Sequence, residues 1–162
     1  MWSSINSFAD IGGGSGFMSI EVCRRHPHLR AISGDLQALQ PVFESYVARE
    51  DPALASRVSF RTIDFKADSF PTEVDAIMFG NMFHGWDDSV KRMLFKKTFD
   101  ALPSGGYILF YEYFLDDGVC INYIMSLTMQ LSGGGRQFTF KEVEAWLTEA
   151  GFVGAEIRKL DK

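Results

Sequence analysis

The segment 8–18 joins an apolar strand, a glycine-rich turn and the start of a helix. Gly12, Gly14 and Gly16 alternate with other residues in this turn, and Asp10 precedes them. Glycine allows a sharp turn at positive φ, and it lets the backbone approach a ligand because it has no Cβ. The helix that follows offers unpaired N–H groups to an anionic ligand group. The segment therefore predicts a ligand-binding turn, and the alternative is a tight strand-to-helix turn that binds nothing.

The spacing of these glycines argues against a dinucleotide-binding turn. That fingerprint is G-x-G-x-x-G. Counted from Gly12 its third glycine falls on Phe17, and counted from Gly14 it falls on Ser19. The pattern present is D-x-G-x-G-x-G, beginning at Asp10. A nicotinamide-dependent dehydrogenase is therefore disfavoured.

Acidic residues follow the next two apolar segments of the chain. Asp35, followed by Leu36, can accept two hydrogen bonds from ribose hydroxyls, or it can cap the helix that begins there. Asp64 can accept from an adenine amino group while Phe65 packs on the ring, and the alternative for this pair is a plain turn. Together these residues favour a ligand that contains adenosine.

The segment 79–88 carries a candidate general base, His84, two residues before Trp86. A phenol with a pKa of about 10 is a poor nucleophile at neutral pH until a base removes its proton. Histidine, with an unperturbed pKa of about 6.5, is largely neutral there and can act as that base. The alternative is a helix-capping or core histidine.

Apolar periodicity alternates between strand and helix along the whole chain. We expect strands near Ser7–Ile11, Ala31–Gly34, Val58–Ile63, Val74–Phe79, Gly106–Tyr111 and Ala155–Leu160. We expect helices near Gly16–His26, Leu39–Arg49, Ser89–Leu102, Val119–Leu131 and Lys141–Ala150. This order predicts an α/β fold with a doubly wound, mostly parallel sheet. Ligands of such sheets bind beyond the carboxyl ends of the strands, which is where the polar residues above recur.

Local signals set several helix ends. Asp87 or Asp88 can cap the helix near Ser89–Leu102. The sequence from Thr139 to Glu142 is a capping box, and the glycines 133–135 predict a helix stop.

Three sequence patterns resemble a known family. D-x-G-x-G-x-G from Asp10 resembles the first motif of class I S-adenosylmethionine-dependent methyltransferases. The segment His84–Trp86, with acidic residues after it, is similar to the catalytic segment of small-molecule O-methyltransferases, which include plant phenolic and hydroxyindole enzymes. Gly-Gly-Arg-Gln at Gly134–Gln137 and Ala-Gly-Phe at Ala150–Phe152 extend the resemblance over nearly the whole chain.

The resemblance implies S-adenosylmethionine as the cofactor, a Rossmann-like class I methyltransferase fold, and methyl transfer to a hydroxyl of a small, aromatic molecule. It places the base at His84, with Glu112 orienting the ring and stabilising the imidazolium. Asp10 suits the methionine ammonium of the cofactor, and the free amides of the turn suit its carboxylate. The expected cofactor-binding residues are Asp10, Gly12, Gly14, Gly16, Asp35, Leu36, Asp64, Phe65, Gly80 and Asn81.

The substrate pocket is expected at Met82, Trp86, Met125, Met129 and Gln137, although methionines at helical spacing can equally be ordinary core. Three positions depart from the family pattern. Gln137 replaces a supporting acid, Gly85 replaces an aspartate, and Gly80 replaces a lysine of the plant enzymes. These departures weaken the case for a plant-like phenolic substrate and leave two rival functions open. One is an N- or C-methyltransferase on the same fold, and the other is a non-catalytic cofactor-binding remnant.

Composition excludes several other classes. The net charge is −5 and no basic run occurs, which argues against a nucleic-acid partner. No apolar run approaches membrane-spanning length, and no signal segment is evident. Cys23 and Cys120, both in apolar helical segments, are expected to be inert core thiols, which suits a cytoplasmic location. No residues show metal-ligand spacing, so no metal is expected.

The ends of the chain bear on its assembly. We interpret residues 1–162 as one methyltransferase catalytic domain that lacks the N-terminal dimerisation domain of the family. Family members end their sheet with a seventh strand, and the chain stops after the expected sixth, so we expect the final strand to be lacking. An open strand edge exposes unpaired backbone groups. Three outcomes are open: the sixth strand pairs with the fifth, a strand of another chain fills the gap, or the edge stays open. Because such an edge exposes apolar faces, we expect a homo-oligomer.

Overall fold

The computed structural model describes residues 2–158 as two compact units. The first unit contains residues 2–80 and 100–111, and the second contains residues 81–99 and 112–158. The chain passes from the first unit to the second between Gly80 and Asn81. Each unit is described by itself.

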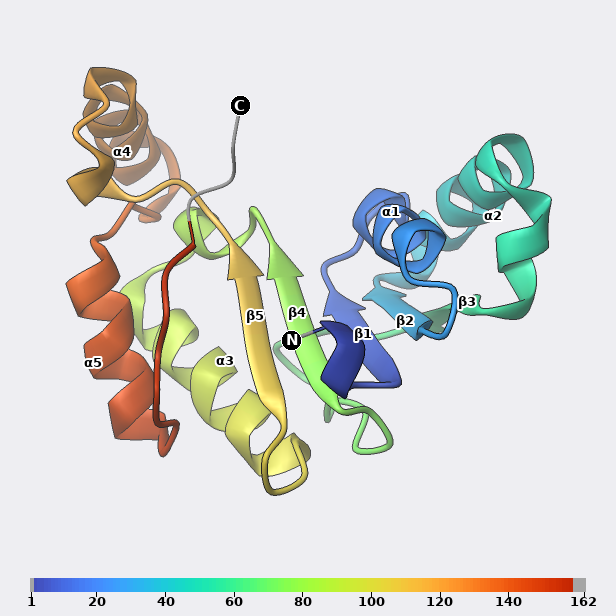
Figure 1. The fold of residues 1–162 in the computed structure, drawn as a ribbon. Helices are drawn as coiled ribbons and strands as arrows, with labels where there is room; N and C mark the ends of the chain where they lie inside the picture. The colour runs from blue at the N-terminus through green and yellow to red at the C-terminus, as the bar shows by residue number, and fades with distance from the viewer. Residues whose placement is uncertain (1, 159–162) are drawn as a thin grey trace. The chain divides into compact units, whose positions relative to one another are not determined.

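The first unit is built on a parallel sheet of five strands in the order β3-β2-β1-β4-β5 (Figure 1). The strands are β1 (Ser7–Ile11), β2 (Arg30–Asp35), β3 (Val58–Thr62), β4 (Ala76–Gly80) and β5 (Tyr107–Tyr111). The strand order reverses between β1 and β4, and Asp10 on β1 lies opposite Ser33 on β2. Ligands of open parallel sheets bind at this reversal.

Two helices of the first unit, α1 (Phe17–Arg25) and α2 (Gln40–Glu50), pack against β2 and β3. Short 3₁₀ turns lie at η1 (Trp2–Ser4), η2 (Gln37–Leu39) and η3 (Pro52–Ser56). A buried apolar cluster joins the helices to the strands, and it includes Phe8, Ile20, Cys23, Ala31, Phe43, Val47 and Val58. Burial of these side chains fixes the start of α1 at the end of β1.

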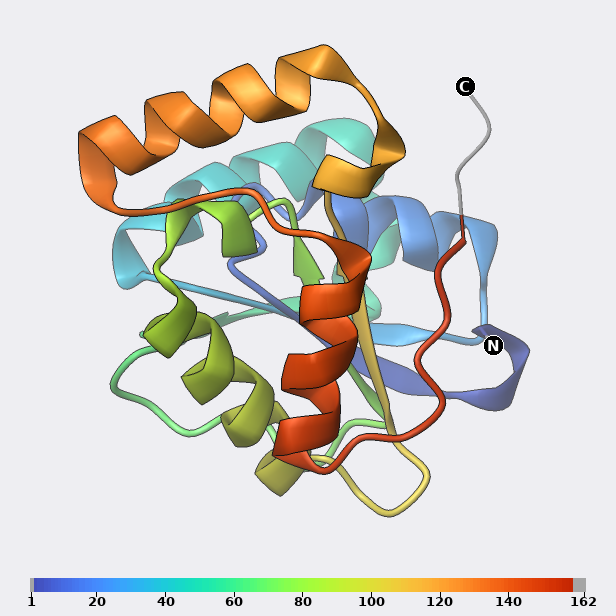
Figure 2. The same ribbon diagram turned by 90° about the vertical axis from the view of Figure 1, so that its left-hand side faces the viewer.

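The second unit is mainly helical. It contains η4 (Phe83–Gly85), all but the last two residues of α3 (Asp88–Ala101), η5 (Leu115–Asp117), α4 (Cys120–Gly133) and α5 (Phe140–Ala150). Helices α3 and α5 lie side by side in both views (Figures 1 and 2). The rings of Phe95 and Trp146 join them, with centroids 6.4 Å apart, and Arg92 forms an ion pair with Glu149.

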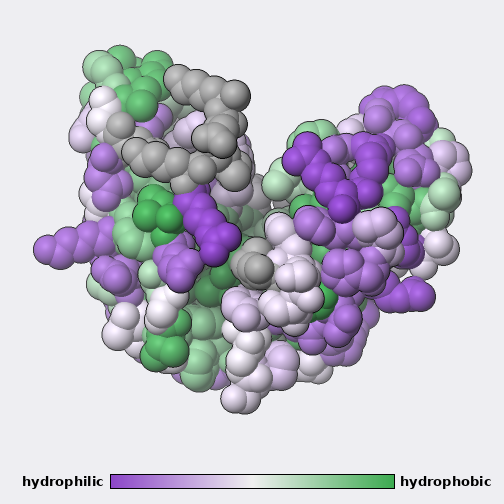
Figure 3. Space-filling model, in the orientation of Figure 1, coloured by the Kyte–Doolittle hydropathy of each residue, from purple (hydrophilic) through white to green (hydrophobic). Residues whose placement is uncertain are grey.

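Helix α4 has an inverted polarity. Its buried residues are Asn122 and Ser126, and the amide of Asn122 donates to the carbonyl of Phe114 at 3.0 Å. Six of its exposed residues are large and apolar, and hydrophobic atoms gather over α4 in Figure 3. These exposed residues are Ile121, Tyr123, Ile124, Met125, Leu127 and Leu131. The helix is therefore fixed to its unit by hydrogen bonds and presents its apolar side outward.

The structure confirms the α/β class, the first five strands and all five helices expected from the sequence, within a few residues at their ends. Asp87 is the cap of α3, because its carboxylate accepts from the amide of Val90 at 3.0 Å. The capping box at Thr139 and Glu142 is present. Gly134 ends α4 in the left-handed conformation, as the predicted helix stop requires.

Two expectations are wrong. The strand expected at Ala155–Leu160 is not formed by residues 155–158, and the rest of that range lies outside the described residues. Gly154, with a φ of +72°, breaks the extended backbone, and Ile157 is 44% exposed, so the segment buries no strand face. Cys120 is exposed at the first residue of α4, whereas Cys23 is buried. Among residues 2–158, no helix is long and apolar enough to span a membrane.

Candidate functional site

The glycine turn after β1 is fixed by hydrogen bonds to β2. The amide of Gly12 donates to the carbonyl of Gly34 at 2.8 Å, and the amide of Gly14 donates to Oδ2 of Asp35 at 2.8 Å. Gly12, Gly14 and Gly16 have φ values of +75°, +56° and +81°. These three positions thus need glycine for the backbone conformation, as the alternating pattern predicted.

Gly13 is constrained by close contacts rather than by a positive φ, which the sequence pattern did not reveal. A Cβ on Gly13 would clash with Oγ of Ser33 and lie 3.2 Å from Oδ2 of Asp10. The turn therefore crosses directly over two polar side chains of the sheet. The strand register identifies Ser33, because this residue lies opposite Asp10 on the neighbouring strand.

Asp10 lies beneath the turn and is only 1% exposed. Its carboxylate accepts from the hydroxyl of Ser19, at 3.0 Å, in the first turn of α1. Burial raises the pKa of Asp10 to about 6; the hydrogen bond from Ser19 opposes this shift, and the charge of Asp35 adds to it. In this arrangement Asp10 ties β1 to the start of α1, and its contact with a cofactor ammonium stays a prediction.

Asp35 is half-buried at the end of β2, and both of its oxygens accept backbone hydrogen bonds. Besides the bond from Gly14, its Oδ1 accepts from the amide of Leu36 at 2.7 Å. Leu36 itself is 51% exposed beside this carboxylate. Asp35 does not cap the following turn η2, which has no side-chain cap. Each carboxylate oxygen can accept about two hydrogen bonds, and each oxygen of Asp35 accepts one from the backbone. Both oxygens can therefore also accept from ribose hydroxyls.

The turn has the features that a cofactor with a carboxylate end would need. The N-cap of α1 is Gly16, which has no side chain to cap the helix. Asp10 takes a backbone hydrogen bond from Ser19, and the first amides of the helix are left for an anion. A Cβ on Gly14 would meet no atom within 4 Å, which shows that this side of the turn is open. Oγ of Ser33 is a buried hydroxyl without a hydrogen-bond partner. The residues present therefore fit S-adenosylmethionine, which the family resemblance implies.

The remaining expected cofactor residues follow β3 and β4. Asp64 forms a local turn, because its Oδ1 accepts from the amide of Lys66 at 2.9 Å; Phe65 beside it is partly exposed. Gly80 is the last residue of β4. Asn81 follows it with a φ of +54°, which asparagine tolerates better than most residues. Their contacts with adenosine stay predictions.

In the second unit, Glu112 brings together two groups of the η4 turn. Its Oε1 accepts from the amide of Phe83 at 2.7 Å, and its Oε2 lies 2.9 Å from Nδ1 of His84. The Glu112 side chain has no exposed surface, whereas the side chain of His84 is 19% exposed. The structure therefore pairs the two residues that the family resemblance assigned to catalysis.

The hydrogen bond from His84 to Glu112 raises the pKa of His84 above its usual value, against the effect of burial. The charge of Glu112 adds to this increase, and the ammonium of Lys91 on α3 opposes it. Because a carboxylate only accepts, Nδ1 of His84 carries the proton in this pair. Nε2 has no hydrogen-bond partner in the described part of the chain.

The expected pocket residues are divided by burial. Met82 and Trp86, on either side of η4, are partly exposed, as is Met129 on α4. Met125 is 45% exposed. Gln137 is 3% exposed, and its Oε1 is a buried acceptor without a partner. Within residues 2–158, no group of three or more His, Cys, Asp or Glu side chains could hold a metal ion.

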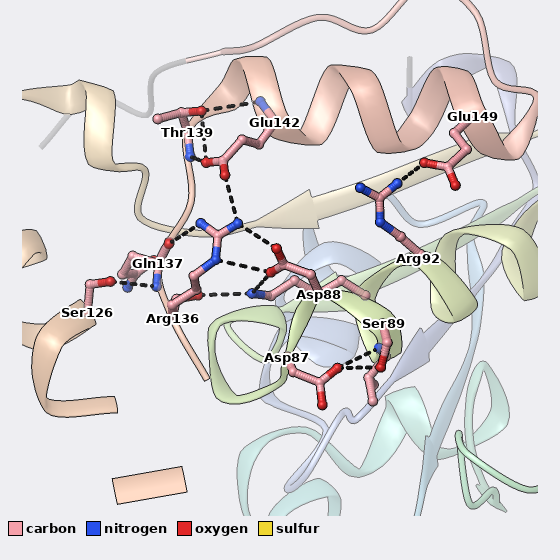
Figure 4. Close-up of polar contacts among 12 residues, drawn as sticks. Asp87, Asp88, Ser89, Arg92, Ser126, Arg136, Gln137, Thr139, Glu142 and Glu149 are labelled. Atoms are coloured by element: carbon pink, nitrogen blue, oxygen red, sulfur yellow. Dashed lines mark hydrogen bonds and ion pairs between the residues drawn. The ribbon is translucent and has the colours of Figure 1, made fainter. Parts of the chain in front are cut away.

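A charged cluster in the second unit was missed by the sequence analysis (Figure 4). Arg136 donates to Asp88 through Nε at 3.1 Å and Nη2 at 2.7 Å, and to Glu142 at 2.7 Å. Lys91 is completely buried, and its Nζ donates to Asp88 at 3.3 Å and to the carbonyl of Arg136 at 3.1 Å. A lysine on a helix normally indicates the solvent-facing side, so no sequence signal predicted this cluster.

We predict that Asp10→Asn stabilises the protein above about pH 6 and loses this advantage in acid. The folded state raises the pKa of Asp10 from 3.8 to about 6, so it binds the proton more tightly than the unfolded chain does. The ionised carboxylate therefore costs up to about 3 kcal/mol at pH values above the folded pKa, and nothing below the unfolded pKa.

Urea unfolding at about pH 8 and about pH 4 measures this difference. Glu44→Gln, at an exposed carboxylate on α2 of the same unit, is the control for the loss of a charge, and the gain in Asp10→Asn at about pH 8 should exceed that of this control. A loss of stability in Asp10→Asn near pH 8 would contradict the prediction.

Comparisons with known proteins identify the family of the chain. The family model for the O-methyltransferase domain matches residues 2–153. The 3-hydroxy-5-methyl-1-naphthoate 3-O-methyltransferase of Streptomyces sahachiroi is 35% identical over 152 residues, which are 92% of this chain and 44% of that protein. The N,N-dimethyltransferase OxyT of Streptomyces rimosus is 30% identical, over 99% of this chain and 46% of that protein. The chain thus spans about half the length of the curated relatives that it matches.

Among solved structures, human N-acetylserotonin methyltransferase in complex with SAM superposes with a TM-score of 0.85 over 97% of this chain and 45% of that chain. Its identity is 24%, so this likeness shows the fold alone. Another structure of the same fold contains SAH, the demethylated form of the cofactor. The chain belongs to the O-methyltransferase domain family, whose cofactor is S-adenosylmethionine.

Proposed function

We propose that this protein transfers a methyl group from S-adenosylmethionine to a hydroxyl of a small aromatic molecule, with His84 as the general base. The observation that carries this proposal is the buried contact of 2.9 Å between Nδ1 of His84 and Glu112. It leaves the lone pair of Nε2 for the acceptor proton. A buried carboxylate behind an imidazole is an arrangement that supports base catalysis.

The residues of the second unit act on the proton. Nε2 of His84 takes the proton from the acceptor hydroxyl as that oxygen forms its new bond to carbon. The ring then carries a positive charge, which Glu112 stabilises across the hydrogen bond to Nδ1. His84 is partly exposed, so solvent can remove the proton afterwards.

The residues of the first unit hold the cofactor, which supplies an electrophilic methyl group when bound. The amides at the start of α1 and in the glycine turn suit its carboxylate, and Asp35 suits its ribose hydroxyls. Asp10, Leu36, Asp64, Phe65 and Gly80 complete the proposed cofactor set of the first unit, and Asn81, the next residue in the chain, is also proposed as part of the set.

An aromatic acceptor is supported by the Streptomyces sahachiroi relative, whose name states a naphthoate substrate. The adaptable side chains of Met82, Met125 and Met129, together with Trp86, suit a flat ring. The unpaired Oε1 of Gln137 can accept a hydrogen bond from an acceptor hydroxyl.

A second candidate is transfer to nitrogen, which the relative OxyT favours. A neutral amine is a good nucleophile before it loses a proton, whereas a phenol is not, so this reaction depends less on a base. The position of the methyl group in the product, and the effect of losing His84, distinguish the two functions.

Self-association and a cytoplasmic location complete the proposal for residues 1–162 as one catalytic domain. The exposed apolar residues of α4 support pairing with a second copy, because burial of such a surface favours association. The unpaired thiols Cys23 and Cys120 suit a reducing compartment.

We predict that the protein binds S-adenosylmethionine and that Asp35→Ala weakens this binding by about 1–3 kcal/mol. The change removes the acceptor for ribose hydroxyls and also releases the amide of Gly14. Isothermal titration calorimetry measures the affinity, with NAD as the ligand that should not bind. Asp51→Ala, at another carboxylate of the first unit, is the matched control, and an unchanged affinity in Asp35→Ala would remove Asp35 from the site.

We predict that His84→Ala lowers turnover of a naphthol acceptor by about 10²–10⁴-fold and leaves cofactor affinity unchanged. His28→Ala, at an exposed histidine of the first unit, is the control. In the parent protein kcat should rise with pH through a pKa above 6.5, because the base must be neutral and Glu112 raises its pKa.

Glu112→Gln removes the charge that raises the pKa of His84, so the rise in kcat should move to lower pH. A His84→Ala variant that methylates as fast as the parent would favour transfer to nitrogen or carbon.

We predict a homo-oligomer in solution, measured by size-exclusion chromatography with light scattering. Leu127→Glu, which charges a residue of α4 that is 57% exposed, should shift the population toward monomer. Val153→Glu, at a residue that is 94% exposed outside α4, is the control. A parent protein that stays monomeric at high concentration contradicts the proposal.

A further inference from the structure

Gly135 lies against the backbone of the η4 turn that carries His84. Gly135 is buried, and a Cβ on it would lie 2.6 Å from the carbonyl carbon of Gly85 and 2.8 Å from its oxygen. It would also clash with the carbonyl oxygen of His84. These are main-chain atoms, which cannot rotate away as a side chain can. Only glycine therefore permits this approach of the two segments.

The neighbouring glycines are present for other reasons. Gly134 has a φ of +80° and ends α4, and a Cβ on it would meet no atom within 4 Å. Gly133 is the last residue of α4 and also has open space around its Cβ position. Close packing against the catalytic turn is thus specific to Gly135 in this run.

The residues directly after Gly135 are strongly anchored. The guanidinium of Arg136 binds Asp88 at the start of α3 and Glu142 at the start of α5 (Figure 4). The carbonyl of Arg136 accepts from the buried Lys91, and the amide of Gln137 donates to Oγ of Ser126 at 3.2 Å. A paired, partly buried guanidinium is costly to displace, so this segment resists movement.

The η4 turn is attached at its first two residues. Phe83 and His84 both bind the carboxylate of Glu112, and the buried ring of Phe83 stacks on Phe95 with centroids 4.8 Å apart. The main chain of His84 and Gly85 lies directly against position 135, so a side chain there would push these two residues away from the anchored segment. This movement would lengthen or break the contact between His84 and Glu112.

We propose that Gly135, held by Arg136, is a positioning residue that keeps His84 on Glu112. The importance of Gly135 for catalysis rests on the proposed function of His84. Its effect on the contact between His84 and Glu112 is independent of that function. The charged groups that face His84 are Glu112 and, from α3, Lys91; neither is changed by a substitution at position 135.

The test compares Gly135→Ala with Gly133→Ala, which adds the same methyl group two residues away into open space. The pKa of His84 is measured by NMR titration of its ring protons, and kcat and the cofactor Kd are measured separately. In Gly135→Ala the pKa of His84 should fall, and kcat should fall by about 10–100-fold. Cofactor Kd should stay within about twofold, because the expected carboxylate- and ribose-binding residues belong to the first unit.

Arg136→Lys provides a second test that adds no bulk and keeps the charge. Lysine cannot reproduce the bidentate contact with Asp88, so the pKa of His84 should fall in this variant too. This variant decides the question if Gly135→Ala does not fold. An unchanged pKa of His84 in the folded variants overturns the proposal.

The two proposals fail in different ways. If the pKa falls in Gly135→Ala but the parent protein methylates no hydroxyl, the positioning role stands and the proposed function fails. If the parent methylates a phenol and Gly135→Ala does so equally well with an unchanged pKa, the positioning role is wrong and the proposed function stands.

Discussion

The chemistry proposed for the second unit depends on the buried carboxylate of Glu112. A carboxylate without exposed surface is stable only when hydrogen bonds satisfy its oxygens, and here one oxygen binds the amide of Phe83 and the other binds the ring of His84. The same group thereby fixes the turn, the orientation of the imidazole and the nitrogen that carries its proton. The η4 turn, Gly135 and the Arg136 cluster matter because they surround this one interaction.

The first unit uses the same physical device. Asp10 and Asp35 are carboxylates that hold backbone or side-chain donors of the glycine turn and of α1. Asp10 thereby links β1 to the first turn of α1, and Asp35 links β2 to the glycine turn. Gly13 permits this because no side chain separates the turn from Asp10 and Ser33.

Sequence reasoning predicted the elements and the residues at strand ends, because these follow from apolar periodicity, glycine spacing and capping residues. It predicted the pairing of His84 with Glu112 only through family resemblance, since no local pattern joins positions so far apart in the chain. It missed Lys91, because a lysine on a helix is expected to face solvent. In the structure Lys91 is buried, and its ammonium donates to Asp88 of α3 and to the carbonyl of Arg136. It was wrong at residues 155–158, where apolar alternation suggests a strand. Gly154, directly before this segment, has a positive φ, and Ile157 is exposed rather than buried in a sheet.

The protonation state of the His84 ring tests the central claim most directly. Long-range ¹H–¹⁵N spectra of the protein, recorded above the pKa of His84, identify which ring nitrogen carries the proton. A proton on Nδ1, facing Glu112, with an unprotonated Nε2 is the predicted result. A proton on Nε2, or the averaged mixture of tautomers that a free histidine shows, would contradict a base held ready by Glu112.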